Sequence, residues 1–306
     1  MKILNIGSLN IDYVYHVDEF VQPGETKTSS GLDVNCGGKG LNQSIAAAKA
    51  GNEVWHAGLI GPEGQFLADK LAENNVNISL VDTVQNQNGH AIIQVNQHGQ
   101  NCILLYAGTN RMLTQAYIDK VLDQFGEEGA VLLQNEVNEL SYIIEQAHKR
   151  GLKIFLNAAP MDSNVLNAPL ALVDWLMVNE VEGCQIAGCS CEEDILPTLR
   201  RKYPTMSILL TLGSKGAVYC SPEETIRVSA CRVPVVDTTA AGDTFCGYFI
   251  YGILHQMEPA EILKLATCAS AICVGRVGAS ESVPSIEEIR GILSRQEIVL
   301  PEIKRS

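Results

Sequence analysis

The chain has 306 residues, 46% of them hydrophobic and 19% charged, and its formal net charge is −13. This composition is typical of a globular protein with one large α/β domain or two modest ones. The acidic balance argues against nucleic acid as a partner, because no basic stripe is present to neutralise its phosphates. One phosphate-bearing small molecule remains compatible, since backbone amides and a bound Mg²⁺ can meet that charge.

The cysteines and the N-terminus indicate a compartment. Ten cysteines are scattered along the chain and form no C-x-x-C pair, which favours free thiols in a reducing cytoplasm. The first residues become polar too early for a signal peptide, and no apolar run approaches the ~20 residues needed to cross a bilayer. We therefore expect a cytoplasmic protein with no membrane partner.

The N-terminal part of the chain begins with a buried strand. Residues 2–8 are a short apolar run that ends in Gly-Ser, and Asn10 and Asp12 follow it. Loops at the carboxyl ends of parallel strands hold ligands in α/β proteins, although Asp12 could instead be a solvated loop residue. A strand at 53–60 and an amphipathic helix at 63–74 are predicted further on.

A second group of strands has one wet face, because apolar and polar residues alternate along them. Their predicted ranges are 13–17, 26–34, 78–84, 90–95 and 101–106, with a hairpin turn at 96–99. These strands do not follow a βαβ rhythm, so we expect them to form a small sheet that projects from the main domain. Such a sheet could cover a ligand, and its exposed face could pair with a second copy of itself.

A glycine-rich turn opens the first helix. It has the sequence Gly37-Gly38-Lys39-Gly40-Leu41-Asn42-Gln43 and leads into an alanine-rich run that Gly51 ends. Gly40 stands where a Walker A loop has Ser or Thr, and the glycine spacing of that loop is missing. No G-x-G-x-x-G follows the first strand either, which argues against a dinucleotide-binding dehydrogenase.

Strands and helices alternate regularly from residue 114 onward. Strands are predicted at 130–134, 152–157, 175–178, 207–212, 217–220 and 226–230. Helices are predicted at 114–125, 139–150, 180–187, 191–203, 242–256, 259–274 and 285–296. This alternation predicts an α/β fold with a central, mostly parallel sheet and helices on both faces. We expect one domain over residues 1–306, with a lid sheet contributed by about 12–35 and 89–107.

Polar side chains gather where the strands of the second half end. They are Glu136, Asn179, Glu182, Thr211, Gly213, Ser214 and Gly216. Parallel strands deliver these residues to one edge of the sheet, which predicts a ligand site there. Each has a structural alternative: Asn179 and Glu182 could form a helix-capping box, and 211–216 could be a plain hairpin turn.

The most informative stretch runs from Asp237 to Phe245, with the sequence Asp-Thr-Thr-Ala-Ala-Gly-Asp-Thr-Phe. A β-like run at 232–236 precedes it and an apolar segment follows, which predicts a strand, a tight turn and a helix start. Small residues let a ligand approach the backbone, and the free amides of a helix start attract an anion. Beside such a site, Asp243 makes sense as a general base for a hydroxyl that attacks phosphorus. The alternative is that Asp243 is only an N-cap.

Two of these segments resemble the two signatures of the ribokinase-like, or PfkB-type, carbohydrate kinases. The first is the glycine-rich turn at 37–43, and the second is the stretch at 237–245. Asn179-Glu180-Val181-Glu182 looks like the family's N-x-x-E motif, and 211–216 looks like its nucleotide loop. The resemblance covers essentially the whole chain in order. It implies a central sheet with helices on both sides and a lid.

The resemblance also implies a role for each matched residue. Asp243 would be the general base, and the backbone amides of Ala240, Ala241, Gly242 and Asp243 would form the anion hole. The sugar would be bound by Asn10, Asp12, Gly38, Lys39, Asn42, Glu136 and Asp243, with Ala91, Ile93 and Leu105 closing over it as a lid. The nucleotide would be bound by Asn179, Glu182, Thr211, Gly213, Ser214, Gly216 and Thr267, with Glu182 organising Mg²⁺ through water.

A monovalent-cation site, usually for potassium, is implied as well. Its ligands would be the side chains of Asp237 and Ser282 and the carbonyls of Thr239, Cys273, Arg276 and Gly278. Glu281 is less usual in this part of the family's sequences.

Within the family, the sugar-contacting set most resembles that of the members that phosphorylate ribose. Asn10, Asp12, Asn42 and Glu136 are donors and acceptors spaced for a small polyol. The expected reaction uses ATP, Mg²⁺ and K⁺ and yields ribose 5-phosphate, and the lid sheet suggests a homodimer. The nearest alternative is a kinase of the same family that acts on fructose, a keto-deoxy sugar acid or a nucleoside. A non-catalytic sugar or nucleotide sensor is a more distant one.

Overall fold

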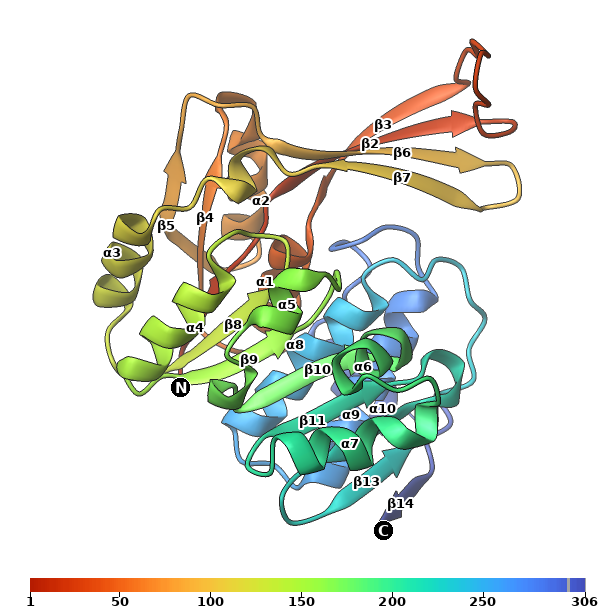
Figure 1. The fold of residues 1–306 in the computed structure, drawn as a ribbon. Helices are drawn as coiled ribbons and strands as arrows, with labels where there is room; N and C mark the ends of the chain where they lie inside the picture. Colours follow the sequence, from red (N-terminus) through yellow and green to blue (C-terminus); the bar gives the residue numbers. More distant parts are fainter. Residues whose placement is uncertain (296–297, 306) are drawn as a thin grey trace.

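The computed structural model describes residues 1–295 and 298–305. The strands are β1 (Ile3–Ile6), β2 (Asn10–Val17), β3 (Gly31–Gly37), β4 (Val54–Ile60), β5 (Val76–Thr83), β6 (Gly89–Asn96), β7 (Asn101–Tyr106), β8 (Ala130–Gln134), β9 (Lys153–Asn157), β10 (Trp175–Asn179), β11 (Ser207–Thr211), β12 (Ala217–Cys220), β13 (Thr225–Val228) and β14 (Ile303–Arg305). They form two separate sheets, a large one in the body and a small one that projects from it as an arm (Figure 1).

Helices cover the large sheet. They are α1 (Lys39–Lys49), α2 (Gln65–Glu73), α3 (Gln115–Phe125), α4 (Leu140–Lys149), α5 (Ser163–Asn167), α6 (Glu180–Ala187), α7 (Ile195–Lys202), α8 (Ala241–Leu254), α9 (Pro259–Val274) and α10 (Ile286–Ser294). Short 3₁₀ turns, η1 (Pro62–Gly64), η2 (Gly108–Arg111), η3 (Leu170–Leu172), η4 (Glu192–Asp194) and η5 (Gly213–Lys215), join several of them.

The large sheet is parallel over most of its width. Its strand order is β14-β13-β12-β11-β10-β9-β8-β1-β4-β5. The strands from β11 to β5 run parallel, whereas β12, β13 and β14 extend the sheet as antiparallel neighbours. Parallel strands end at one edge, so this arrangement gathers the loops after β1, β8, β10 and β11.

The sheet separates two hydrophobic cores. Successive side chains of a strand point to opposite faces, so Ile3 packs into one core and Leu4 into the other. Helices α1, α2, α8, α9 and α10 contribute the buried residues of the first core. Helices α3 to α7 contribute those of the second. The predicted fold, with helices on both faces of a mostly parallel sheet, is confirmed.

The small sheet has the strand order β3-β2-β6-β7. Asp12 pairs with Ala91, and Ala91 pairs with Leu105, so the three lie in one row on one face of the sheet. Ile93 lies two residues beyond Ala91 and therefore shares this face. The predicted lid residues thus stand beside Asp12. In the hairpin between β6 and β7, Gly99 has a positive φ of 73° and lies at the predicted turn.

Several predicted elements differ from the structure. The run at 232–236 is not a strand but an irregular loop, and Val235 and Val236 are exposed because no neighbouring strand pairs with them among the described residues. The strand predicted at 78–84 belongs to the large sheet as β5, where it pairs with β4. The strand predicted at 26–34 begins only at Gly31. Residue 296, the predicted end of the last helix, lies outside the described residues.

No helix in the described part of the chain combines the length and the apolar character that a bilayer crossing requires.

Candidate functional site

A cavity of about 220 Å³ lies at the carboxyl edge of the large sheet. Its lining residues come from several strand ends and from the starts of α1, α6 and α8. They are Lys39, Asn157, Ala159, Met177, Val178, Asn179, Glu182, Thr211, Thr238, Ala240, Gly242, Asp243 and Cys246. The cavity therefore brings the predicted base together with part of the predicted nucleotide set.

Asp243 lies in the first turn of α8, but it is not the N-cap. The N-cap is Ala240, in the left-handed region with a φ of 58°, and no side chain of the described residues caps this helix. The Asp243 carboxylate instead accepts hydrogen bonds from the side chains of Gln43 (2.8 Å) and Asn42 (3.4 Å). The N-cap alternative for Asp243 is thus wrong, because its carboxylate points to α1 rather than to the amides of its own helix.

The glycine-rich turn brings α1 very close to the end of β1. A Cβ at Gly40 would collide with the backbone of Gly7 and Ser8, so only glycine fits there. This contact places Lys39 at the cavity. The negative charge of Asp243 raises the pKa of the Lys39 ammonium against the opposing effect of burial, and Glu136 and Glu182 add to the increase. A cation held among three carboxylates is suited to receive an anionic ligand.

The predicted sugar residues lie beside the cavity. Asn10 is buried and its Oδ1 accepts from Asn110 Nδ2 at 2.7 Å. Glu136 Oε2 accepts from the Lys39 amide at 2.8 Å and from the hydroxyl of Ser8. Burial raises the pKa of Asp12 to about 7, and the charge of Glu136 adds to this effect. Asp12 is therefore not the solvated loop residue of the alternative interpretation.

Asn179 and Glu182 form the capping box that the sequence left open. Asn179 Oδ1 accepts from the Glu182 amide at 2.9 Å, and Glu182 Oε2 accepts from the Asn179 amide at 2.9 Å. Both residues also line the cavity, so capping does not remove them from the site. Burial raises the pKa of Glu182, although the Asn179 amide and the charge of Lys39 act in the opposite direction.

The predicted nucleotide loop is mostly outside the cavity. Thr211 lines the cavity, and its hydroxyl donates to the Val178 carbonyl at 3.3 Å. Gly213 and Ser214 are exposed, and Gly216 has a φ of 103°, which favours glycine. Thr267 lies on α9, and its buried hydroxyl has no hydrogen-bond partner within the described part of the chain.

The predicted cation ligands gather around Asp237. Its Oδ1 accepts from the Thr239 amide (2.9 Å) and hydroxyl (2.7 Å), and its Oδ2 accepts from the Gly278 amide at 3.1 Å. Burial acts to raise the pKa of Asp237, but these three donors outweigh it and the pKa is lowered. Cys273 connects the two segments, because its Sγ lies 3.6 Å from the Thr239 carbonyl and 3.0 Å from Ser282 Oγ.

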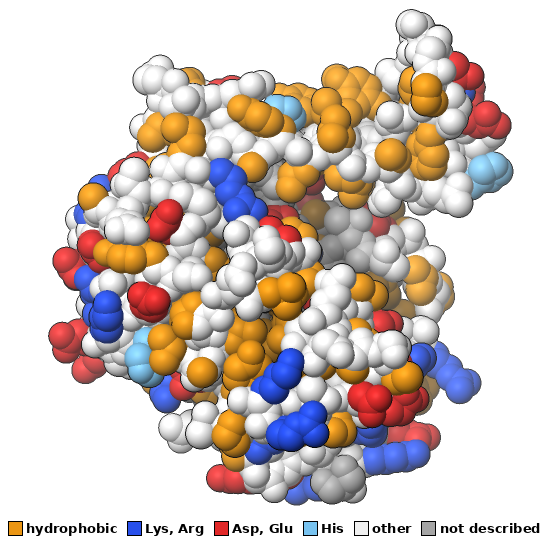
Figure 2. All heavy atoms as spheres, in the orientation of Figure 1, with side chains coloured by type: hydrophobic (Ala, Val, Ile, Leu, Met, Phe, Trp, Pro, Cys, Tyr) orange, Lys and Arg blue, Asp and Glu red, His pale blue; other side chains and the backbone are white. Residues whose placement is uncertain are grey.

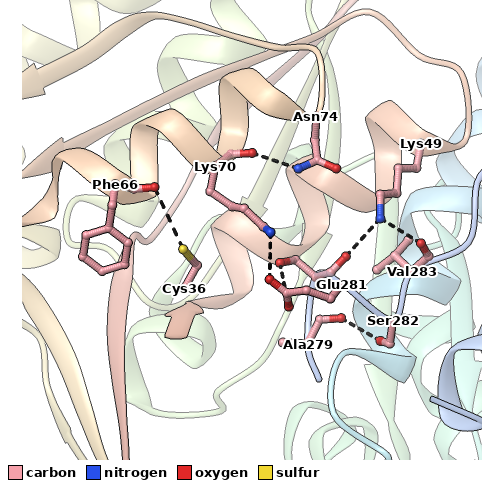
Figure 3. Close-up of polar contacts among 10 residues, drawn as sticks. Cys36, Lys49, Phe66, Lys70, Asn74, Ala279, Glu281, Ser282 and Val283 are labelled. Atoms are coloured by element: carbon pink, nitrogen blue, oxygen red, sulfur yellow. Dashed lines mark hydrogen bonds and ion pairs between the residues drawn. The ribbon is translucent and has the colours of Figure 1, made fainter. Parts of the chain in front are cut away.

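The loop that carries Gly278 and Ser282 is held from two helices (Figure 3). Lys70 of α2 forms an ion pair with Glu281 at 2.8 Å. Lys49 of α1 donates to the carbonyls of Ser280 (3.2 Å) and Val283 (2.9 Å). The unusual Glu281 therefore has a structural partner. Arg276 is held separately through its ion pair with Glu288 of α10.

Some residues of the site were not predicted from the sequence. Asn157 and Cys246 line the cavity, and Asn157 Nδ2 lies 3.3 Å from Cys246 Sγ. Asn157 ends β9, so the carboxyl-edge rule that found Asn179 could have found it. Gln43 and Gln134 touch or support the base through buried side chains. Gln134 ends β8 and pairs with Asn157, so the same rule could have found it as well.

Comparison with known proteins agrees with this geometry. The model of the pfkB family of carbohydrate kinases matches residues 1–286. The ribokinase of Haemophilus influenzae is 30% identical over 293 residues, which cover 92% of this chain and 95% of that protein. A deoxyribokinase of Salmonella typhi is also 30% identical, over 97% of this chain and all of that protein.

A solved structure agrees as well. The ribokinase of Cryptococcus neoformans in complex with ADP has a TM-score of 0.82 and 32% sequence identity. The match covers 95% of this chain and 99% of that one. The chain belongs to the pfkB family of carbohydrate kinases and is an ATP-dependent sugar kinase.

Proposed function

We propose that this protein phosphorylates D-ribose at O5, with Asp243 as the general base. The observation that carries this proposal is the position of Asp243: it faces Asn42 and lines the cavity that also contains Lys39 and Glu182. The ribokinase of Arabidopsis thaliana, a structural neighbour with 26% identity and a TM-score of 0.82, was solved with ribose and ATP. This neighbour supports ribose as the acceptor.

The acceptor hydroxyl gives its proton to Asp243 as its oxygen bonds to the γ-phosphorus of ATP, and the bond from that phosphorus to the bridging oxygen breaks to release ADP. The charge that develops on the transferring group is met by backbone amides at the start of α8. The Ala241 amide already donates to the Thr238 carbonyl at 3.3 Å. The anion hole therefore consists chiefly of the Gly242 and Asp243 amides, which lack intrahelical partners at a helix start.

Lys39 and Glu182 supply the charges of the phosphate site. The Lys39 ammonium lies near both the base and Glu182. Its positive charge can stabilise the negative charge of the transferring phosphoryl group there. Glu182 uses Oε2 for the capping box, which leaves Oε1 for a water bound to Mg²⁺, with Asn179 beside it. Mg²⁺, when bound, neutralises phosphate charge.

The proposed sugar site contains a hydrogen-bond acceptor that has no donor among the described residues. Among the described residues, nothing donates to Asn42 Oδ1, which is buried. A buried polar atom of this kind costs free energy unless a ligand satisfies it, so a sugar hydroxyl fits here. Ala91, Ile93 and Leu105 share a sheet face with Asp12, and closure of this face over the sugar would exclude water.

A substrate panel tests the proposal. Ribose, 2-deoxyribose, fructose, a keto-deoxy sugar acid and adenosine are compared by ADP release at saturating ATP. We expect the highest kcat/KM with ribose. 2-Deoxyribose is the second candidate because the Salmonella deoxyribokinase is as similar as the ribokinases are. A higher kcat/KM with any other substrate would overturn ribose while leaving the kinase chemistry intact.

We also propose a potassium site at Asp237, Thr239, Cys273, Arg276, Gly278 and Ser282. One carboxylate with hydroxyl and carbonyl oxygens suits a weakly charged, hard cation. The bonds of Asp237 with Thr239 and Gly278, and the contact of Cys273 with Ser282, support this proposal. The bound cation would hold the 237–243 turn in shape. Activity and thermal stability should both be higher in K⁺ than in Na⁺ or choline. Equal values in all three salts would refute the site.

The small sheet supports a homodimer. Leu32, Val34, Ile92, Leu104 and Tyr106 lie on the face opposite Asp12 and are 38% to 68% exposed. Figure 2 shows hydrophobic side chains along this arm. An exposed apolar face of this kind marks an association surface. The proposed dimer acts in the cytoplasm, and Leu104→Lys should convert it to a monomer in analytical ultracentrifugation.

A further inference from the structure

A chain of buried amides leads away from the carboxylate of Asp243. Gln43 Nε2 donates to Asp243 Oδ1 at 2.8 Å, and Gln43 Oε1 accepts from Gln134 Nε2 at 2.8 Å. Gln134 Nε2 also lies 3.2 Å from Asn5 Oδ1. The side chains of Gln43, Gln134 and Asn5 are fully buried. Burying three neutral amides costs free energy that apolar side chains would not cost, and hydrogen bonds only offset it. Their presence here therefore suggests a role that apolar residues could not fill.

The direction of the donors in this chain is set by its two ends. A carboxylate can only accept, so Gln43 must present Nε2 to Asp243 and Oε1 to Gln134. Gln134 must then present Nε2 to Gln43. At the far end, Asn5 Nδ2 donates to the Gly40 carbonyl and to Ser44 Oγ, both at 2.8 Å, so Asn5 Oδ1 faces Gln134. No amide in the chain can flip without facing two acceptors or two donors toward each other.

The chain of buried amides also has no room to move. A Cβ at Gly7 would lie 2.6 Å from Gln134 Oε1 and 2.9 Å from Asn5 Oδ1, so the amides fill the space that a side chain would need. Ser44 Oγ lies 2.8 Å from His56 Nδ1, and burial lowers the pKa of His56 to about 4. His56 is therefore neutral at physiological pH, and its Nδ1 can accept from the Ser44 hydroxyl. Packing and hydrogen bonding together hold each amide in one orientation.

We infer that Gln43 is a positioning residue for the catalytic base, and that Gln134 and Asn5 hold its amide so that Nε2 always faces Asp243. Pinning Oδ1 fixes the plane of the carboxylate. Oδ2 is then the oxygen that faces Asn42, and it is the one that takes the proton of the sugar hydroxyl. This inference rests on the proposed role of Asp243 as the base. Because Gln43 is fully buried and does not belong to the cavity lining, its loss should affect turnover more than binding.

The test compares isosteric variants that remove the amide but keep the volume. Gln43→Met should lower kcat about 10- to 100-fold, because a small misplacement of a reacting group has an effect of this size. The dissociation constant of ribose, measured by calorimetry without ATP, should change little. Gln134→Met should lower kcat less, since Gln43 would keep its bond to Asp243 but lose its orienting donor.

A matched control separates positioning from general loss of a buried amide. Asn52 follows α1, and its buried side chain donates only to the Ala47 carbonyl (2.9 Å) within the described residues. Asn52→Leu should leave kcat at the wild-type value. Thermal unfolding of each variant reports how much stability the substitution removes, so that a kcat loss can be compared at equal stability.

A double-mutant cycle with Asp243→Asn decides between a positioning role and a merely structural one. In single turnovers with excess enzyme, Gln43→Met should lower the rate in the wild-type background and have little further effect in the Asp243→Asn background. An equal loss in both backgrounds, or a wild-type kcat in Gln43→Met, overturns the inference. Near-normal turnover in Asp243→Asn alone would instead overturn the proposed base.

Gln43→Met removes one of the two acceptors of Gln134 Nε2 and leaves only Asn5 Oδ1, so the single variant could fold poorly. The double variant Gln43→Met/Gln134→Met removes both partners, which is tolerated better than removing one. It should fold and show at least the kcat loss of Gln43→Met. A folded double variant with wild-type kcat would also overturn the inference.

Discussion

The two sides of Asp243 are built differently. On the sugar side, Asn10 and Asn42 are buried, and Glu136 is bonded to the turn that opens α1. On the nucleotide side, Gly213 and Ser214 lie on an exposed turn whose shape is set by the backbone bond from Leu212 N to Gly216 O (2.8 Å). The proposed sugar side therefore consists of side chains that the fold already holds in place, and the proposed nucleotide side consists mainly of backbone.

This difference in burial indicates which of the two sides selects its ligand more strictly. Asn42 Oδ1 is buried and has no donor among the described residues, so we expect the proposed sugar side to reject a ligand that cannot supply one. An exposed backbone turn accepts any group that fits its outline. We therefore expect substitutions on the sugar side to have larger effects than those on the nucleotide turn, with the base between them more sensitive than either.

The largest effect is expected for the base itself. Asp243→Asn should lower kcat roughly 10²- to 10⁴-fold, because the amide cannot accept the proton of the attacking hydroxyl. Ribose binding should persist, since the other sugar residues are unchanged. Steady-state kinetics and calorimetry measure the two quantities. A comparable loss of ribose binding would place Asp243 in ground-state recognition rather than in proton transfer.

The buried carboxyl group of Asp12, on the proposed sugar side, should lower the free energy of unfolding in a pH-dependent way. The folded-state pKa of Asp12 is about 7, above the ordinary value of 3.8. The native state therefore holds the proton more tightly, and this contribution to stability is lost as pH rises from about 4 through 7. Asp12→Asn should gain up to roughly 4 kcal/mol over wild type at pH 8 and little at pH 4.

Urea denaturation at the two pH values measures this gain. Asp18→Asn, at an exposed position after β2, serves as the control and should show no such pH-dependent difference. If Asp12→Asn were no more stable than wild type at pH 8, ionised Asp12 would not destabilise the folded protein as expected.

The next effect concerns Asn42 Oδ1, the buried acceptor on the proposed sugar side. Asn42→Leu preserves volume but removes both the free Oδ1 and the contact with Asp243. The ribose KM should rise about 10- to 100-fold, as expected for a lost buried hydrogen bond, while the KM of ATP stays near wild type. An unchanged ribose KM would mean that Asn42 does not touch the sugar.

The smallest effect is expected on the nucleotide turn. Ser214 is exposed, and removal of its hydroxyl leaves the backbone of the turn in place. Ser214→Ala should change the KM of ATP by less than about threefold, as for most surface substitutions. A tenfold increase would show that this turn recognises the nucleotide through side chains, and the contrast between the two sides would fail.

Much of the fold could be predicted because its signals are local. The buried strand β8 and the helices α6 and α9 lie at the predicted residues, since apolar periodicity and helix-end residues depend only on neighbours in the chain. The run at 232–236 has the same local signal as a strand. It remains a loop because no neighbouring strand pairs with it among the described residues, a matter of tertiary structure.

The chemistry of the site divides in the same way. Asp243, Lys39 and Glu182 could be proposed from their motifs, because these residue types at these spacings are suited to a phosphate and a reacting hydroxyl. The roles of Gln43, Gln134 and Asn5 could not, since they are separated by up to 129 residues and act as one hydrogen-bonded chain. Only folding brings three buried amides into line behind one carboxylate, and only their mutual directions show which oxygen faces the sugar.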